Sequence, residues 1–188
     1  MFLTVHKITY VGQGVSETGK MSNTQFQDLG MSSENVTEYR ALQPGDQLAV
    51  EGEMHGIDYY HHGIFISHTE GIIEYGGENK ANARVRQVDL IQFTGYGKRR
   101  LLKITYPDDQ CLPPYEVVEN AKKLLANPKE WGGYNALKNN CEHFAMKCKT
   151  GMAVSIQVIE KLKECIKNPF QALRYSVASS FGGGSSIS

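Results

Sequence analysis

The sequence predicts an α+β domain in which strands come first and helices follow. Runs rich in β-branched and aromatic residues are grouped between about residues 47 and 106, and apolar residues at helical spacing take over after Pro113. This separation of the two kinds of element is typical of the α+β class. A chain of 188 residues is long enough for one domain with a sizeable core and some loose ends.

Five runs have the composition of strands, and turn residues separate them. Pro44-Gly45-Asp46 is a turn signal directly before the first run, and Pro107 closes the last one. The polar residues 67–70 are typical of a hairpin connection between the second and third runs. The predicted strands are residues 47–51, 59–66, 71–76, 84–88 and 101–106.

Three helices are predicted after the strands. The first begins after Pro114 and ends near Pro128, since its apolar residues recur at helical spacing and a proline stops a helix. The second begins at Asn140, a favoured N-cap residue, and ends near Gly151. The third covers about residues 155–167 and carries its apolar residues on one face.

These patterns divide the chain into three parts. Residues 1–38 are predicted to be a polar, flexible N-terminal segment, because residues from about 12 onward are rich in Gly, Ser, Thr, Asn and Gln. Residues 39–152 hold the predicted strands and the first two helices. Residues 153–188 are predicted to form an amphipathic helix and a disordered tail of glycine and serine.

Charge and hydropathy exclude several classes of protein. The 20 basic and 20 acidic residues cancel, so no net field attracts nucleic acid, and we expect none as a partner. No stretch reaches the roughly 18 consecutive apolar residues of a membrane span, and the first residues lack the basic leader and long apolar centre of a signal peptide. The four cysteines show neither a CxxC motif nor zinc-finger spacing, which favours free thiols in a reducing cytoplasm and no metal or other cofactor.

The run Asn139-Asn140-Cys141 carries a strong chemical signal. With Asn140 as the N-cap, Cys141 lies in the first turn of the second helix, where unpaired backbone N–H groups and the positive end of the helix dipole favour a thiolate. A cysteine in such a place can have its pKa lowered from about 8.5 to between about 3.5 and 7.5. The alternative is a buried cysteine in a core helix, and a nucleophile also needs a base.

Six histidines are available as that base. His143 is two residues from Cys141, and positions i and i+2 of a helix point roughly 200° apart, so we expect His143 to pack or to cap the helix. His6 and His55 lie in segments with no other signal and are expected at the surface.

The other histidines lie in or beside the second predicted strand. His61 and His62 face opposite sides of the sheet, so only one of them is expected to face the Cys141 helix. Gly63 would leave room beside His61, but strand alternation alone keeps both residues open as the base. His68, in the predicted hairpin connection, is a further candidate.

Two motifs together resemble those of the lecithin–retinol acyltransferase-like family, which includes small phospholipid acyltransferases and phospholipases. Asn140-Cys141-Glu142-His143-Phe144 resembles its cysteine box, and His61-His62-Gly63-Ile64-Phe65 resembles its histidine box. Pro44-Gly45-Asp46 resembles the turn ahead of its first strand, and Cys148-Lys149-Thr150-Gly151 fits the run after the cysteine box. The resemblance spans roughly residues 41–152.

This resemblance implies a circularly permuted papain-like fold, in which an antiparallel sheet packs on the helix that carries the cysteine. It implies Cys141 as the nucleophile and His61 as the base, with residues 39–152 as the catalytic domain. Many relatives carry a second histidine on the next strand to orient the first. The nearest match here is Glu74, whose carboxylate can accept the N–H of His61, and His68 stays open for the same role.

The resemblance predicts a thiol-dependent acyltransferase or phospholipase A-type hydrolase that acts on phospholipid acyl esters through an acyl-thioester on Cys141. A papain-like cysteine peptidase and a non-catalytic interaction module are the alternatives. A cytoplasmic location is expected. Several relatives have a C-terminal transmembrane anchor, whereas the helix at 155–167 carries lysines beside its apolar face. It either packs on the domain or makes peripheral contact with a membrane.

Overall fold

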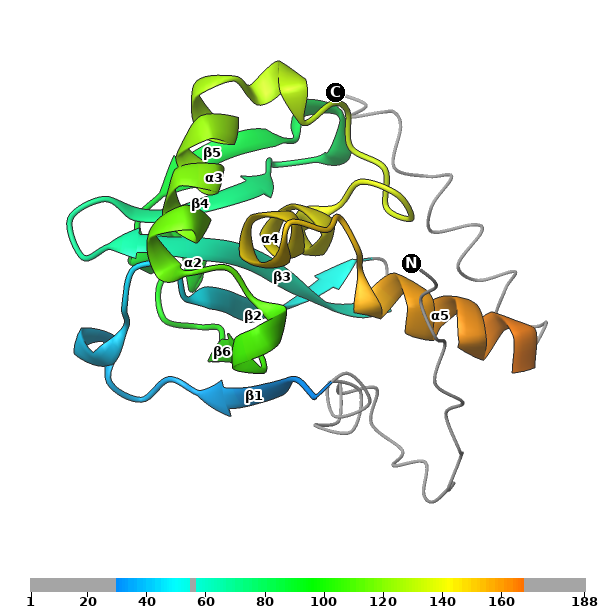
Figure 1. Cartoon of the computed structure of the whole chain (residues 1–188). Coiled ribbons are helices and arrows are strands. Elements are labelled where there is room, and N and C mark those ends of the chain that lie inside the picture. The colour runs from blue at the N-terminus through cyan, green and yellow to red at the C-terminus, as the bar shows by residue number, and fades with distance from the viewer. Residues whose placement is uncertain (1–29, 55–56, 168–188) are drawn as a thin grey trace, which may run out of the picture.

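The computed structural model of the chain describes residues 30–54 and 57–167 (Figure 1). In this part of the chain, six strands form one antiparallel sheet in the order β1-β6-β2-β3-β4-β5. The strands are β1 (Ser32–Asn35), β2 (Gln47–Met54), β3 (Ile57–Ser67), β4 (Gly71–Gly76), β5 (Arg84–Val88) and β6 (Leu101–Thr105). The helices are α2 (Leu90–Phe93), α3 (Pro114–Ala126), α4 (Cys141–Thr150) and α5 (Ile156–Lys167), with short 3-10 helices at Tyr39–Ala41, Lys80–Asn82, Asp108–Gln110 and Pro128–Glu130. The predicted α+β class is confirmed.

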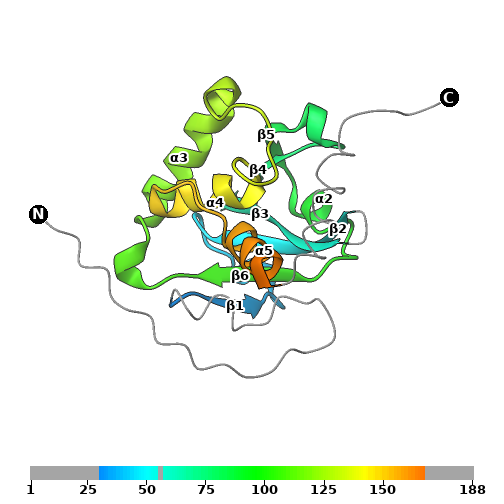
Figure 2. The same ribbon diagram turned by 90° about the vertical axis from the view of Figure 1, so that its right-hand side faces the viewer.

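The two faces of the sheet are covered by different helices. Figure 2 shows α3 and α4 on one side of the sheet and α2 on the other. On the first side, Phe144 and Ala145 of α4 pack against buried Ile64 and Ile73 of the sheet. On the second side, Phe93 of α2 packs in a cluster with residues of β2, β3, β4 and β6. Because both faces are covered, the central strands carry buried apolar residues on both sides.

The β3–β4 hairpin fixes which residues of these two strands share a face. The turn requires Gly71, which has φ 77° and lies so close to Val88 that an added Cβ would come within 2.3 Å of its carbonyl oxygen. The resulting register places Gly63 opposite Glu74. His61, two residues before Gly63, therefore points to the same face of the sheet as Glu74.

One part of the predicted domain division is wrong in the structure. Ser32–Asn35 fall within the segment 1–38 that was expected to be flexible, yet they form an edge strand paired with β6, with Ser32 opposite Thr105. Backbone hydrogen bonds to an existing sheet edge hold this strand, and its polar sequence carries no apolar alternation that could reveal it. Residues 1–29, His55 and the glycine-serine tail lie outside the described residues.

Candidate active site

Cys141 is the first residue of α4, and Asn140 caps that helix as the sequence predicts. The Asn140 Oδ1 atom accepts the backbone N–H groups of Glu142 at 2.9 Å and of His143 at 3.0 Å. At the other end, Gly151 adopts φ 79° and closes the helix. The cap holds Cys141 at the positive end of the helix dipole, where the side chain is 4% exposed.

The sulfur of Cys141 reaches the edge of β3 where β4 no longer runs beside it. β4 pairs with β3 from Gly63 to Ser67, so Tyr60 lies beyond the paired stretch. The Cys141 Sγ atom is 3.8 Å from the carbonyl oxygen of Tyr60. The start of the cysteine helix is therefore next to the strand residue that precedes His61.

The side chain of Gln157, from α5, takes the place of a strand partner at this edge. The N–H of Tyr60 donates to Gln157 Oε1 at 2.6 Å, and Gln157 Nε2 donates to the carbonyl oxygen of Tyr60 at 3.0 Å. These are the two hydrogen bonds that a neighbouring strand would make with one residue. Gln157 thus fastens the beginning of α5 to β3 beside Cys141.

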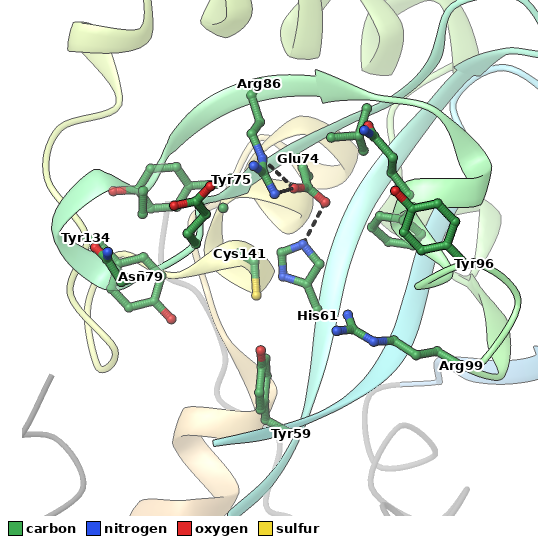
Figure 3. A pocket seen from close by; sticks show the side chains of 17 residues that line it. Tyr59, His61, Glu74, Tyr75, Asn79, Arg86, Tyr96, Arg99, Tyr134 and Cys141 are labelled. Atoms are coloured by element: carbon green, nitrogen blue, oxygen red, sulfur yellow. Dashed lines mark hydrogen bonds and ion pairs between the residues drawn. The ribbon is translucent and has the colours of Figure 1, made fainter. Parts of the chain in front are cut away.

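His61 lies between Cys141 and Glu74 (Figure 3). Its Nε2 atom is 2.7 Å from Oε2 of Glu74, and its ring also hydrogen-bonds the side chain of Cys141. Burial by itself would lower the pKa of His61. The charge at Cys141 and the hydrogen bonds to Cys141 and Glu74 outweigh burial and raise this pKa to about 10. The site therefore favours the imidazolium form of His61.

Glu74 is a buried carboxylate shared by two cationic groups. Besides contacting His61, its Oε1 atom accepts from Nε of Arg86 at 2.7 Å, and Nη2 of Arg86 is also 2.7 Å away. The β4–β5 register places Arg86 directly opposite Glu74. Burial would raise the pKa of Glu74, but the hydrogen bond and charge of His61, together with Arg86, hold it below its ordinary value.

Gly76, rather than Gly63, provides the space beside the histidine. A Cβ at Gly76 would lie 3.0 Å from Glu74 Oε1 and 3.1 Å from Cε1 of His61. A Cβ at Gly63 would instead meet Ile72 at 2.5 Å, so Gly63 makes room for core packing. The expectation that Gly63 leaves room for a catalytic group is wrong, because the hairpin brings the end of β4 against the ring.

His62 points to the opposite face of the sheet and is completely buried. Its Nδ1 atom is 3.1 Å from Nε2 of Gln47, and its Nε2 atom is 3.1 Å from Nε2 of Gln157. Burial, with a smaller effect of the charge on His61, lowers the pKa of His62 to about 3. His62 is thus a neutral part of a buried polar network.

It is His62, and not His61, that shares a face with the body of α4. The expectation that the histidine facing the cysteine helix would be the one to meet Cys141 therefore fails. The cysteine lies at the tip of the helix, beside the strand edge, and His61 reaches it from the other face of the sheet.

The structure separates the remaining candidate histidines from Cys141. Nδ1 of His143 is 2.9 Å from Oδ1 of Asn140, and the N–H of Asn140 donates to the same Nδ1 at 3.4 Å, so His143 caps the helix as predicted. His68, at the hairpin turn, contacts the ring of Phe65 with centroids 5.2 Å apart. Of the two groups considered as partners of His61, Glu74 contacts it.

The other described cysteines lie in different surroundings. Cys148 is completely buried in the core between α3, α4 and the sheet, and burial raises the pKa of its thiol to about 12. Cys111 is half-buried and, like Cys141 and Cys148, forms no disulfide. Of the cysteines that the structure describes, Cys141 is the one whose side chain lies beside an imidazole ring, that of His61.

Cys141, His61 and Glu74 line one cavity of about 620 Å³. A volume of this size is within the usual range for small-molecule binding cavities. Aromatic side chains make up much of its wall. The cavity is lined by Tyr59, His61, Glu74, Tyr75, Gly76, Gly77, Glu78, Asn79, Ala83, Arg86, Val88, Gln92, Phe93, Tyr96, Arg99, Tyr134 and Cys141.

Several residues of this region gave no signal in the sequence. Gln157 is 97 positions from Tyr60, so no local pattern could connect them. The ring of Phe93 lies tilted against that of His61, with centroids 5.6 Å apart, and comes from a four-residue helix that was not predicted. Arg86 lies directly opposite Glu74 and on the same face, but Val85 and Val88 of β5 are three residues apart, so the sequence of this strand does not define its faces.

An antiparallel sheet packed on the helix that carries a cysteine, with the histidine strand earlier in the chain, defines a circularly permuted papain-like α+β protein. The sequence model of the family described as lecithin retinol acyltransferase matches residues 40–154, and the chain belongs to this family. The resemblance found in the sequence is thereby confirmed. The family comprises thiol-dependent acyltransferases and phospholipases that act on phospholipids.

Searches of curated proteins and of solved structures returned no match to the chain. Two further observations apply to residues 30–54 and 57–167 alone. No helix there has the length and apolar character needed to cross a membrane. Nor does that part of the chain contain a group of three or more His, Cys, Asp and Glu side chains able to hold a metal ion.

Proposed function

We propose that this protein is a thiol-dependent acyltransferase and phospholipase A-type hydrolase, which transfers acyl groups from phospholipid esters through an acyl-thioester on Cys141. The observation that carries the proposal is the continuous series of contacts from Cys141 through His61 to Glu74 at the wall of one cavity. A nucleophile, a base and a group that orients the base are the parts that acyl transfer by a thiol requires.

In the first half of the reaction, the Cys141 thiolate attacks the ester carbonyl carbon. A C–S bond forms, the ester C–O bond breaks, and the His61 imidazolium gives its proton to the leaving lysophospholipid oxygen. Since Nε2 of His61 is held by Glu74, Nδ1 is the atom that carries this proton. The Asn140 cap uses the N–H groups of Glu142 and His143, and the N–H of Cys141 is proposed to hold the oxyanion.

In the second half, neutral His61 takes a proton from water or from the amine or hydroxyl of an acceptor. The oxygen or nitrogen of that group attacks the thioester, the C–S bond breaks, and the Cys141 thiolate returns. Water yields a free fatty acid, and an acceptor yields an acylated product. Glu74 accepts the N–H of His61 throughout and stabilises the imidazolium.

The proposal includes peripheral contact with a bilayer through α5. This helix is fastened to the domain at its first turn and extends away from the sheet (Figure 1). Within the described part of the chain, its apolar residues Ile159, Leu162 and Ile166 remain 40%, 49% and 82% exposed. An amphipathic helix with exposed apolar residues and nearby lysines is typical of a helix that lies in a membrane interface.

The proposal is tested by the products formed from phosphatidylcholine in mixed micelles, with phosphatidylethanolamine added as an acceptor. The wild-type protein is expected to release fatty acid, to form N-acylated acceptor, or both. Cys141→Ser is expected to lose both products, whereas Cys111→Ser is expected to keep them, because Cys111 is a half-buried thiol outside the cavity. Products that persist in Cys141→Ser, or a wild type that cleaves peptides and no lipid ester, would contradict it.

A further inference from the structure

Two arginines line the cavity around Cys141, and they differ in how their charge is balanced. Arg86 forms an ion pair with the buried Glu74. Among the residues that the structure describes, no side chain forms a hydrogen bond or an ion pair with the guanidinium of Arg99. A guanidinium at the wall of a substrate cavity without an acidic partner is suited to bind an anion brought by the ligand.

The backbone that presents Arg99 is unusual. Gly95, Tyr96 and Gly97 follow one another with φ angles of 61°, 61° and 76°. A tyrosine in the left-handed region is strained, and such strain persists where the surrounding structure holds it and often occurs at functional sites. After this turn, the N–H of Arg99 donates to the carbonyl oxygen of Thr94 at 3.0 Å, which fixes the start of the Arg99 side chain.

The charge of Arg99 is directed into the cavity. Figure 3 shows its side chain running toward His61, on the side of the cavity where Tyr59 also lies. Burial and the charge at Cys141 raise the pKa of Tyr59, and Arg99 acts in the opposite direction. The electrostatic effect of Arg99 therefore extends to a tyrosine beside the nucleophile.

We propose that Arg99 binds the phosphodiester of the phospholipid whose ester is presented to Cys141, and so selects esters that carry a phosphate. The proposal rests on the function proposed above and assigns recognition of the headgroup phosphate to Arg99. A guanidinium offers paired N–H donors that match two phosphate oxygens, and such charge-assisted bonds are strong. In a glycerophospholipid, only the short glycerol bridge separates the ester carbonyl from the phosphate, so one cavity can hold both groups.

Binding can be measured without turnover by using a short-chain diether phosphatidylcholine, which has no ester for Cys141 to attack. The probe is titrated into the full-length protein, and the ¹⁵N signal of the Arg99 Nε–H group is followed by NMR. Arg99→Gln is expected to weaken binding of this probe by about 10- to 100-fold, the range for a lost hydrogen bond to a charged group. Arg99→Lys is expected to lose less, because the charge remains and the paired donors do not.

Lys98→Gln is the matched control, since it removes the same charge from an exposed neighbour that does not line the cavity. It is expected to bind the probe like the wild type. The corresponding neutral diether glycerol is expected to bind wild type and Arg99→Gln equally. Equal affinities of wild type and Arg99→Gln for the phospholipid probe, or equal losses for both probes, would overturn the proposal.

Titration with inorganic phosphate tests whether Arg99 binds a lipid headgroup or any phosphate anion. If Arg99 reads a headgroup, the diether phospholipid binds more tightly than phosphate alone. A phosphate ion that binds as tightly as the phospholipid, with the same shift of the Arg99 signal, would overturn the lipid assignment. This binding series is also independent of the reaction: a protein that forms no acyl-thioester contradicts the proposed function, whereas the affinities still decide the role of Arg99.

Discussion

The Oε2 atom of Glu74 lies 2.7 Å from Nε2 of His61, on the side of the imidazole ring that is turned away from Cys141 (Figure 3). This contact leaves Nδ1 as the ring atom available to the thiol. It also couples the protonation of the ring to a buried carboxylate whose other oxygen is held by Arg86. His61, Glu74 and Arg86 lie on β3, β4 and β5, so their geometry depends on the register of these three strands.

Glu74→Gln is expected to slow acylation of Cys141 by about 10-fold or more. The amide cannot stabilise an imidazolium as a carboxylate does, so the pKa of His61 falls, and each unit of that fall lowers the ratio of imidazolium to neutral imidazole tenfold. The measurement is the pH profile of Cys141 alkylation together with the rate of acylation. Glu78→Gln removes the same charge elsewhere on the cavity wall and is the control. Equal effects of the two substitutions would show that only the general field of the cavity matters.

Replacing His143 is expected to lower stability, whereas replacing His61 is expected to abolish activity. His143→Ala removes one half of the capping box and is predicted to lower the free energy of unfolding by about 1–2 kcal/mol, while lipid turnover per folded molecule stays near the wild-type value. His61→Asn is predicted to abolish turnover with a smaller change in stability. Urea unfolding and product formation measure the two effects. A His143→Ala protein that is fully folded and inactive would contradict this division of roles.

Gln157→Ala is expected to loosen the edge of β3 beside the nucleophile. The substitution removes the two hydrogen bonds with the backbone of Tyr60, and buried groups that lose a partner cost about 1–3 kcal/mol each. Hydrogen exchange of the Tyr60 amide is therefore expected to accelerate. Glu164→Ala, on the exposed surface of the same helix, is expected to change stability by less than about 0.5 kcal/mol. Unchanged exchange at Tyr60 in Gln157→Ala would show that α5 does not hold the strand edge.

His62 is expected to make the fold sensitive to acid. Its pKa is lowered to about 3 in the folded protein and is about 6.5 in an unfolded chain, so between these values the unfolded state binds a proton that the folded state does not. Stability contributed by this residue is complete above about pH 6.5 and is lost as the pH falls toward 3.

The effect is isolated by comparing the wild type with His62→Gln. The wild type is predicted to lose stability more steeply between pH 6.5 and 4.5, by up to about 1.4 kcal/mol for each pH unit. Glu142, whose pKa is raised by burial, acts in the opposite direction, and the comparison removes its effect as long as it stays buried. Parallel stability curves for the two proteins would show that His62 can be protonated in the fold.

The features predicted correctly are those set by neighbours in the chain. Asn140 and Gly151 bound α4 because a cap and a left-handed stop are local properties of a helix end. The β3 and β4 strands follow from their β-branched and aromatic content, and the polar turn between them gives the hairpin. Once the hairpin is predicted, the pairing of His61 with Glu74 is within reach, since residues on one face of adjacent strands meet.

The features missed depend on contacts between distant segments. β1 is a polar edge strand whose pairing with β6 leaves no trace in its own sequence. The space beside His61 comes from Gly76, which approaches the ring only because β4 folds back on β3. Gln157 reaches Tyr60 from a helix for which the sequence leaves two placements open, packing on the domain or contact with a membrane. Side-chain direction across such distances is fixed by packing, which a single sequence does not display.

The most direct test of the central claim is the mass of the intact protein after brief mixing with dioleoyl phosphatidylcholine and an acid quench. The proposed chemistry predicts an added mass of one oleoyl group, located on the peptide that contains Cys141 and removed by neutral hydroxylamine. The adduct is expected to be absent from Cys141→Ser and to form much more slowly in His61→Asn. An acyl group found on another residue, or no adduct on Cys141 while lysophospholipid is released, would contradict the claim that this thiol carries the reaction.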